Sequence, residues 1–339
     1  MKIQHDVLSI RDTGPARYKT ALSAAGLVLL LMFLPFVVPS VTLMKLMCYA
    51  LFAAGFNLLF GVVGLLSFGH AAFFGGGAYA AAIVITKLGA TPELALLVGT
   101  IFAAALGSVF GFLAVRRQGI YFAMVTLAFA QMFYFACLQF PITGSEDGIQ
   151  GVKRGSFAGF IDLSYDNKLY IVVLVLFVLG NLAIWRIVHS PFGSILKAIR
   201  DDERRVTSLG IKVEDYKLTV FILSATICGL AGAMKALVFE FATLTDVSWQ
   251  VSGDAIVMTI LGGSGSLFGP LLGASIYIAL QTLVVSLKIP TSVVTGAIFI
   301  ICVLFLPRGV AGTLSDLLAS FTRRIGSKAK ARTQSRDTD

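Results

Sequence analysis

The chain has 339 residues, of which 57% are hydrophobic and only 13% are charged, and its formal net charge is +9. Soluble domains average about 45–50% apolar and about 25% charged residues, so this composition excludes an ordinary soluble fold. Apolar stretches of roughly 20 residues recur, which is the length of a helix that crosses about 30 Å of hydrocarbon. The sequence therefore predicts an all-α, polytopic integral membrane protein.

About ten transmembrane or re-entrant helices are expected within a transmembrane domain at residues 21–306. The apolar stretches that predict them are residues 21–38, 41–61, 68–87, 94–115, 120–140, 169–188, 218–238, 254–264, 268–288 and 291–306. The first stretch is too long for the apolar core of a signal peptide, so we expect it to remain as the first helix.

The distribution of Lys and Arg predicts the orientation of the chain, because basic residues gather on the cytoplasmic side of membrane proteins. Most of the 27 basic residues fall in residues 1–20, 116–117, 186–217 and 308–336. Both termini are therefore expected in the cytoplasm, and the loop 141–168 is expected on the outer side.

The tail 307–339 is polar and basic and has no periodic apolar residues, so we expect it to be disordered. It is either a simple topology signal or a segment that binds the acidic headgroups of membrane lipid. This distribution accounts for the positive net charge without any nucleic acid partner.

One internal loop, "SPFGSILKAIRDDERRVTSLG", is unusually rich in charge and lies between two apolar stretches. Its apolar residues recur at helical spacing, with Ser190 as a candidate N-cap, Pro191 at the first helical position and Gly210 as a stop. The spacing predicts one short amphipathic helix. Its polar face mixes both signs of charge, which favours docking into a protein groove over lying on anionic lipid, and a solvated loop helix is the alternative.

Two glycine-rich stretches, "GLLSFGHAAFFGGGAYAAA" and "LGGSGSLFGPLLGASIYIAL", share a layout around a Phe-Gly pair. Glycine interruptions at corresponding places predict broken or re-entrant helices and an internal inverted repeat, and close glycine packing is the alternative. The glycines expected at the breaks are Gly69, Gly75, Gly76, Gly263, Gly265 and Gly269. Neither stretch matches the nucleotide-binding pattern G-x-x-x-x-G-K-[ST], and no Lys follows "GGSGSLFG" to reach phosphates, so we expect no ATPase in this chain.

Polar side chains inside apolar spans are costly and often functional, so they are candidates for a substrate pathway. The candidates are Asn57, Ser67, His70, Tyr79, Thr126, Gln131, Ser264 and Ser266. Ordinary hydrogen bonds between helices are the alternative for each of them. Asp254 is expected to cap the start of a helix. No spacing of His, Cys or acidic residues indicates a metal site, a cofactor or catalysis.

The blocks "NLLFGVVGLLSFGHAAFFGGGAYAAA", "GIYFAMVTLAFAQM", "TGSEDGI", "SPFGSILKAIRDDERRVTSLGI" and "LGGSGSLFGPLLGA" resemble the permeases of bacterial branched-chain amino acid ABC importers. Within that family the chain is more similar to the LivM type than to the LivH type. The resemblance covers residues 57–273 in matching order.

This resemblance implies a permease in the bacterial inner membrane that pairs with a related LivH-type subunit. Two cytoplasmic ATP-binding subunits, which use ATP and Mg²⁺, and a periplasmic solute-binding protein complete such an importer. The loop 190–212 then corresponds to the coupling helix that contacts the ATPase. The residues implied in that contact are Arg200, Asp201, Asp202, Glu203, Arg204, Leu209 and Gly210. The family's Glu-Ala-Ala pattern is only partly kept, because Arg204 and Arg205 follow Glu203.

The implied mechanism is alternating access, with the binding protein on the outer segments Thr143–Gly151 and Phe239–Gly253. The implied cargo is leucine, isoleucine and valine, with urea, short amides or another amino acid as alternatives in the same family. A stand-alone secondary transporter would need an acidic residue at midspan, whereas Glu93, Glu240 and Asp254 lie near span ends. A membrane-embedded enzyme would need a cluster of catalytic groups, which the sequence lacks.

Overall fold

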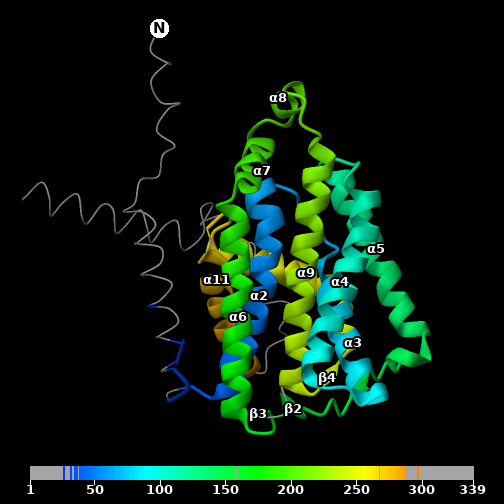
Figure 1. Ribbon diagram of the computed structural model, residues 1–339, viewed down its shortest axis with the longest axis vertical. Coiled ribbons are helices and arrows are strands. Elements are labelled where there is room, and N and C mark those ends of the chain that lie inside the picture. The colour runs from blue at the N-terminus through cyan, green and yellow to red at the C-terminus, as the bar shows by residue number, and fades with distance from the viewer. Residues whose placement is uncertain are drawn as a thin grey trace, which may run out of the picture.

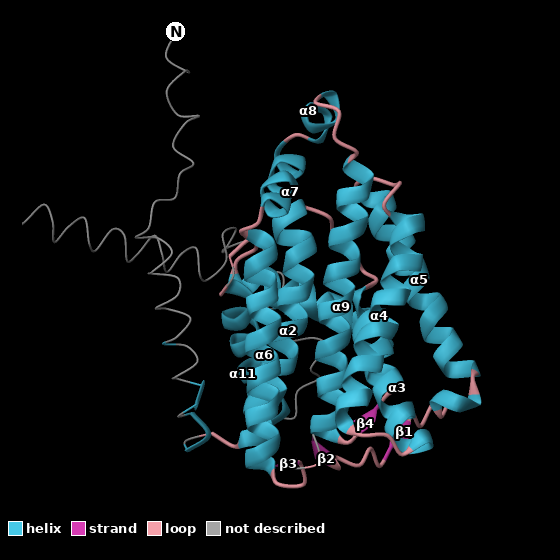
Figure 2. Cartoon of the chain, viewed as in Figure 1, coloured by secondary structure: helices cyan, strands magenta, loops and turns pink. Residues whose placement is uncertain are grey.

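The computed structural model shows a bundle of long helices with two short helices beyond one end and four short strands at the other (Figures 1 and 2). It describes residues 26, 31–32, 34–36, 38–157, 159, 161–266, 268–286 and 296–297. The expected segments 1–20 and 307–339 lie outside the described residues, as do most of the spans 21–38 and 291–306. We refer to the two ends of the bundle as the α8 end and the strand end.

Eight helices form the described part of the bundle: α2 (Ser40–Val63), α3 (His70–Leu88), α4 (Pro92–Ala114), α5 (Ile120–Gln139), α6 (Asp166–Val188), α9 (Val213–Phe239), α10 (Trp249–Gly262) and α11 (Gly269–Ser286). Helices α2 to α6 and α9 are long and apolar enough to cross a membrane. The prediction of a polytopic, all-α membrane protein is confirmed.

The bundle is built around α2 and α9, whose surfaces are mostly buried, whereas α4, α5 and α6 leave most of theirs uncovered. The uncovered positions carry large apolar side chains, for example Ile101 on α4, Met124 on α5 and Leu179 on α6. Apolar side chains that face outward suit hydrocarbon and would be unfavourable over such an area in water.

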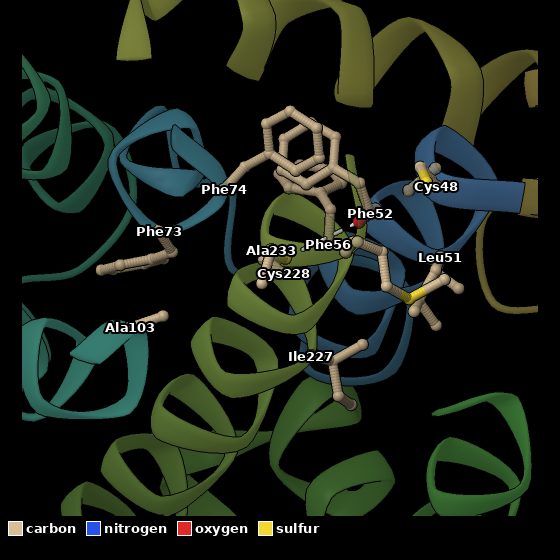
Figure 3. Close-up of a cluster of buried hydrophobic side chains, with 14 of the residues drawn as sticks. Cys48, Leu51, Phe52, Phe56, Phe73, Phe74, Ala103, Ile227, Cys228 and Ala233 are labelled. Atoms are coloured by element: carbon tan, nitrogen blue, oxygen red, sulfur yellow. Dashed lines mark hydrogen bonds between the residues drawn. The ribbon is translucent and has the colours of Figure 1, made fainter. Parts of the chain in front are cut away.

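Glycine allows the central helices to touch backbone to backbone. Gly77 of α3 lies directly against the carbonyl of Gly229 in α9, and a Cβ on Gly99 of α4 would lie only 2.6 Å from the Gly77 oxygen. Close approach at small residues is the usual way in which membrane helices associate. Beside this contact, Phe52 and Phe74 pack with ring centroids 4.5 Å apart between α2 and α3 (Figure 3).

The strand end is closed by the loop 141–168 and the segment after α9. Strand β1 (Ile149–Gln150) pairs antiparallel with β4 (Phe241–Ala242), and β2 (Ser156–Phe157) pairs with β3 (Ile161–Asp162). Arg154 adds ion pairs to Asp166 at 2.7 Å and to Glu240 at 2.9 Å. The short helices η2 (Pro141–Thr143) and η3 (Leu244–Val247) flank the pairing.

Candidate coupling hairpin and polar sites

The charged loop folds into two helices, α7 (Pro191–Asp201) and α8 (Glu203–Ser208), so the expectation of a single helix is wrong. Ser190 caps α7 as expected, accepting a hydrogen bond from the Gly193 amide at 3.3 Å. Asp202 makes the break: its backbone is extended (φ −158°, ψ 96°), and its carboxylate accepts from the Arg205 amide and caps α8. Asp favours such caps because its short side chain competes for backbone amides.

This α7–α8 hairpin lies beyond one end of the bundle (Figure 1). One of its faces is buried, whereas its tip is exposed. Leu196, Ile199 and Val206 pack inward, and Gly210 ends the hairpin with a left-handed backbone (φ 83°). The implied coupling residues that face outward are Asp201, Asp202, Arg204, Leu209 and Gly210. Leu209 is 75% exposed and is a large apolar side chain on an otherwise charged surface.

Arg200 is also exposed, but it differs from these residues because its guanidinium is hydrogen-bonded to the bundle. Its Nη1 donates a hydrogen bond to the carbonyl of Gly61, near the end of α2. The same nitrogen would lie 3.6 Å from a Cβ on Gly265, in the loop between α10 and α11. Arg200 therefore bonds the hairpin to α2 just before the first glycine-rich interruption and lies beside the second.

Glu203 is also held from inside. Its carboxylate forms an ion pair with Lys217 of α9 at 2.6 Å and accepts a hydrogen bond from Gln118, between α4 and α5, at 3.1 Å. Lys217 is buried, so this pair is better shielded from water than a surface ion pair. This ion pair joins α8 to α9.

Asn57 fastens the second glycine-rich stretch to α2. Its amide oxygen accepts from the Gly265 amide at 3.0 Å, and its amide nitrogen donates to the Ser266 carbonyl at 2.9 Å. The Ser266 hydroxyl accepts from the Gly269 amide at 2.7 Å, where α11 begins. Ser264 and Ser266 are exposed at the α8 end.

The two glycine-rich stretches lie at the same end of two parallel helices. Thr259 of α10 donates to the Ala53 carbonyl of α2, and the later residues Gly265 and Asn57 meet further along in the same direction. An inverted repeat relates elements that run in opposite directions. The shared layout of these two stretches therefore gives no support to the predicted inverted repeat.

The first glycine-rich stretch interrupts the helical path between Val63 and His70, as expected. Gly64 ends α2 with a left-handed backbone (φ 84°), and Ser67 accepts from the Gly69 amide at 3.2 Å. Thr126 of α5 accepts from the Phe68 amide at 3.2 Å. Ser67 and Thr126 thus satisfy the backbone of a non-helical segment that is surrounded by protein.

His70 occupies a closed aromatic cage formed by Phe56, Phe73 and Phe221. Its Nε2 lies 2.9 Å from the hydroxyl of Ser224, and that hydroxyl donates to the Gly55 carbonyl at 2.6 Å. Because the Ser224 proton is used in this way, Nε2 is the donor in its contact with that hydroxyl. The side chain is fully buried, so in this conformation it ties α3 to α9 and α2 and faces no open pathway.

The other candidates do not gather around one opening. Tyr79 is buried on α3, and its hydroxyl has no hydrogen-bond partner among the described residues, whereas Gln131 is half-buried on α5. Gly75 packs against Val247, and Gly76 packs against Leu106. The close contacts around Gly69 and Gly269 are instead with backbone atoms or with Ser and Thr side chains.

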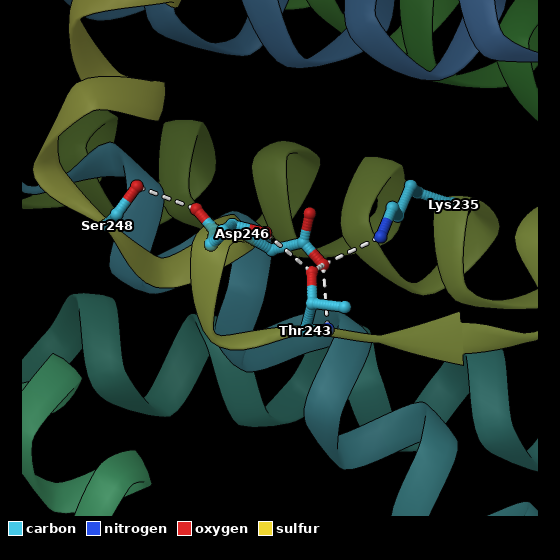
Figure 4. A network of polar contacts seen from close by, with 5 residues as sticks. Lys235, Thr243, Asp246 and Ser248 are labelled. Carbon is cyan, nitrogen blue, oxygen red and sulfur yellow. Dashed lines mark hydrogen bonds and ion pairs between the residues drawn. The ribbon is translucent and has the colours of Figure 1, made fainter. Parts of the chain in front are cut away.

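The sequence analysis missed a buried ion pair at the strand end. Lys235 of α9 lies 2.7 Å from Asp246 of η3, and the two residues are 4% and 5% exposed (Figure 4). Asp246 also accepts from the amide and the hydroxyl of Thr243, and the ammonium lies 4.3 Å from the centroid of the Phe241 ring. The Thr-x-x-Asp spacing at 243–246 is a capping signal that would have marked the acid.

Asp254 is not a helix cap, which corrects that expectation. Helix α10 begins at Trp249, so Asp254 lies in its second turn, and its carboxylate interacts with the hydroxyl of Tyr277 on α11. The expected start at residue 254 was too late because Trp249 to Gly253 is only moderately apolar. No group of three His, Cys or acidic side chains that would suit a metal ion occurs in the described part of the chain.

These features define a multi-pass helical membrane protein with glycine-interrupted helices and an exposed hairpin anchored to the points of interruption. Residues 39–303 match the family described as branched-chain amino acid transport system / permease component, and the chain belongs to this family. No solved structure matches it significantly.

Individual relatives agree with the family match. The chain is 29% identical to the high-affinity branched-chain amino acid transport system permease protein LivM of Escherichia coli over 287 residues, which are 78% of this chain and 68% of the relative. It is 22% identical to LivH of the same species over 282 residues, or 78% of this chain and 91% of LivH. BraD of Pseudomonas aeruginosa is 23% identical over 283 residues, with 78% and 91% covered. The greater similarity to LivM confirms the expected type.

Proposed function

We propose that the chain is the permease subunit of an ATP-driven, binding-protein-dependent importer for branched-chain amino acids. Relatives with this description in their names and membership of the same family support the cargo. The chain is proposed to be a non-catalytic subunit that binds no cofactor, with ATP and Mg²⁺ used by partner subunits. A related LivH-type permease is the proposed partner in the membrane.

One observation carries the coupling role. The α7–α8 hairpin exposes Asp201, Arg204 and Leu209, while Arg200 and Glu203 hold its other side to α2 and α9. A surface that meets an ATPase and is anchored to the helix ends can convert ATPase closure into helix movement. ATP binding then favours one conformation of the helices, because the ATPase subunits contact the hairpin differently in the two conformations.

The distribution of basic residues supports an orientation with the α8 end in the cytoplasm and the strand end in the periplasm of a bacterial inner membrane. The proposed contacts of the solute-binding protein, Thr143–Gly151 and Phe239–Gly253, then share one surface, because β1 pairs with β4. A pocket of about 350 Å³ lies between them, lined by Gln150, Gly151, Glu240, Phe241 and Thr243. A protruding side chain of the binding protein would fit there.

The test is uptake of radiolabelled leucine into proteoliposomes that contain this chain with its co-purifying permease and ATPases. Binding protein is added outside and ATP is enclosed inside, with isoleucine, valine, glutamate and urea as unlabelled competitors. We expect ATP-dependent leucine uptake that isoleucine and valine inhibit and that urea does not. Uptake without ATPases would contradict the proposal. If leucine is not taken up and only a urea-loaded binding protein stimulates ATP hydrolysis, the cargo is urea and not leucine.

A further inference from the structure

The pocket at the strand end combines an apolar wall with a carboxylate. It has a volume of about 350 Å³ and is lined by Gln150, Gly151, Glu240, Phe241 and Thr243. Pockets of roughly 300 Å³ and more hold small ligands, so this one has room for a long side chain of a partner protein. Gly151 contributes no side chain, and a Cβ there would meet nothing within 4 Å, so the space in front of it is open.

The pairing of β1 with β4 forms the apolar wall. Gln150 lies directly opposite Phe241 in this ladder, and residues opposite each other in antiparallel strands point to the same side. The neighbouring pair, Ile149 and Ala242, points inward and is buried. Gln150 and the half-buried Phe241 therefore face the pocket together, as an amide beside an aromatic ring.

The carboxylate of Glu240 is fixed in place beside this wall. Glu240 follows α9 with a left-handed backbone (φ 62°), which is unfavourable for a residue that has a Cβ. Its carbonyl accepts a hydrogen bond from the Val152 amide at 2.9 Å, and its carboxylate lies 2.9 Å from Nε of Arg154. The position of the carboxylate is thus set before a partner binds, which lowers the entropic cost of binding.

Arg154 does not neutralise the acids around it. Its guanidinium lies 2.7 Å from the Asp166 carboxylate and 2.9 Å from that of Glu240, and it also donates to the Val238 carbonyl at 2.9 Å. One positive charge therefore serves two negative charges. The Arg154 side chain is 15% exposed, whereas those of Asp166 and Glu240 are 51% and 49% exposed. The excess negative charge is thus presented to solvent.

The turn before β1 brings further acids to the same surface. Gly148 packs against the Ala242 carbonyl in β4, so the exposed Glu146 and Asp147 of this turn lie near the pocket. Lys153 is an exposed base that follows in the same loop. Together with the excess charge beside Arg154, the turn makes this surface acidic, although the formal net charge of the whole chain is +9.

We propose that the pocket receives a lysine or arginine side chain of the solute-binding protein. Its charged head pairs with the Glu240 carboxylate, and its methylene stem lies on the Phe241 ring. Long basic side chains combine an apolar stem with a charged head, which matches the two walls of the pocket. An acidic side chain would be repelled, and an apolar one would desolvate the carboxylate without pairing it. This inference rests on the proposed function and adds the chemistry by which the partner is recognised.

The test measures the dissociation constant of the leucine-loaded binding protein for the importer in nanodiscs. The probe is the binding protein that supports leucine uptake by the unmodified importer. Glu240→Gln removes the charge and keeps the shape, so the dissociation constant should rise about tenfold or more and depend less on salt. Asp162→Asn, at an exposed acid on β3, is the matched control and should bind normally. Any loss of uptake in Glu240→Gln should disappear with excess binding protein, which a folding defect would not allow.

A photo-crosslink identifies the side chain that enters the pocket. With p-benzoylphenylalanine in place of Gln150, the crosslinked peptide of the binding protein should contain a lysine or arginine. Replacing that base by Glu should weaken binding, and combining the change with Glu240→Lys should restore it.

Three results would overturn the proposal. An unchanged dissociation constant in Glu240→Gln, or a crosslinked peptide without a base, would exclude the pocket as the docking site while leucine uptake by the unmodified importer upholds the proposed function. Tighter binding by Glu240→Gln would indicate an acidic partner surface. If no binding protein supports leucine uptake by the unmodified importer, the proposed function and the pocket assignment fall together.

Discussion

Arg200 on the α7–α8 hairpin donates a hydrogen bond to the backbone carbonyl of Gly61, a residue 139 positions earlier in the chain. The acceptor lies in the last turn of α2, where helix carbonyls have no partner within the helix. The contact therefore satisfies a helix end and at the same time attaches that end to the proposed ATPase-binding surface.

Replacing Arg200 with Ala should uncouple ATP hydrolysis from transport. The hairpin would keep its exposed tip but lose its attachment to α2, so leucine transported per ATP hydrolysed should fall about tenfold, the scale of typical coupling free energies. Lys197→Ala is the matched control, because Lys197 is an exposed cation on the same helix. An unchanged ratio in Arg200→Ala would contradict the coupling role.

The double substitution Asp202→Lys and Glu203→Lys should abolish ATP-driven uptake and leave membrane insertion intact. It removes the cap of α8 and places a new ammonium group beside the buried Lys217. Like charges at such a site repel strongly. Uptake and the amount of protein in the membrane would be measured together. Normal uptake would show that the hairpin does not couple ATP hydrolysis to transport.

Asn57→Ala should loosen the loop between α10 and α11. The substitution leaves the Gly265 amide and the Ser266 carbonyl without partners, which costs about 1–3 kcal/mol for each group that stays buried. Hydrogen exchange of the amides at 263–266 should accelerate. Asn181→Ala is the control, because the Asn181 side chain donates to a carbonyl of its own helix. Equal exchange rates at 263–266 in the two variants would mean that Asn57 does not hold this loop.

The Lys235–Asp246 pair should show strong energetic coupling. Removing one partner leaves a buried charge uncompensated and costs about 3–5 kcal/mol, whereas removing both is often nearly neutral. Thermal unfolding of Lys235→Met, Asp246→Leu and the double variant would measure this. Additive losses in the double variant would mean that the two side chains do not depend on each other.

Gly269→Leu should stop transport, because even a Cβ at this position would collide with the Gly263 carbonyl and the Ser266 hydroxyl. The side chain would force α10 and α11 apart. Gly253→Ala provides a comparison on α10, since a Cβ there meets nothing within 4 Å. If both variants transport normally, the close approach of α10 and α11 is not required.

The sequence predicted the long helices well because a span of about 20 apolar residues has few alternatives in a membrane. Ser190, Pro191 and Gly210 likewise act within their own turn, so their roles were readable. The break at Asp202 was missed because helical periodicity continues across it. The contacts of Arg200 and Glu203 with the bundle, and the pair of Lys235 with Asp246, join segments that are distant in sequence. A single sequence does not encode such contacts in any local pattern.

The pairing of β1 with β4 also sets an order for assembly of the chain during its synthesis. Gln150 pairs with Phe241, so the first strand leaves the ribosome roughly ninety residues before its partner, or roughly 5–20 s earlier at typical bacterial elongation rates. During that interval α6, the hairpin and α9 must be made and inserted. The loop 141–168 therefore takes its final shape only after the helices on both sides of the hairpin have been made.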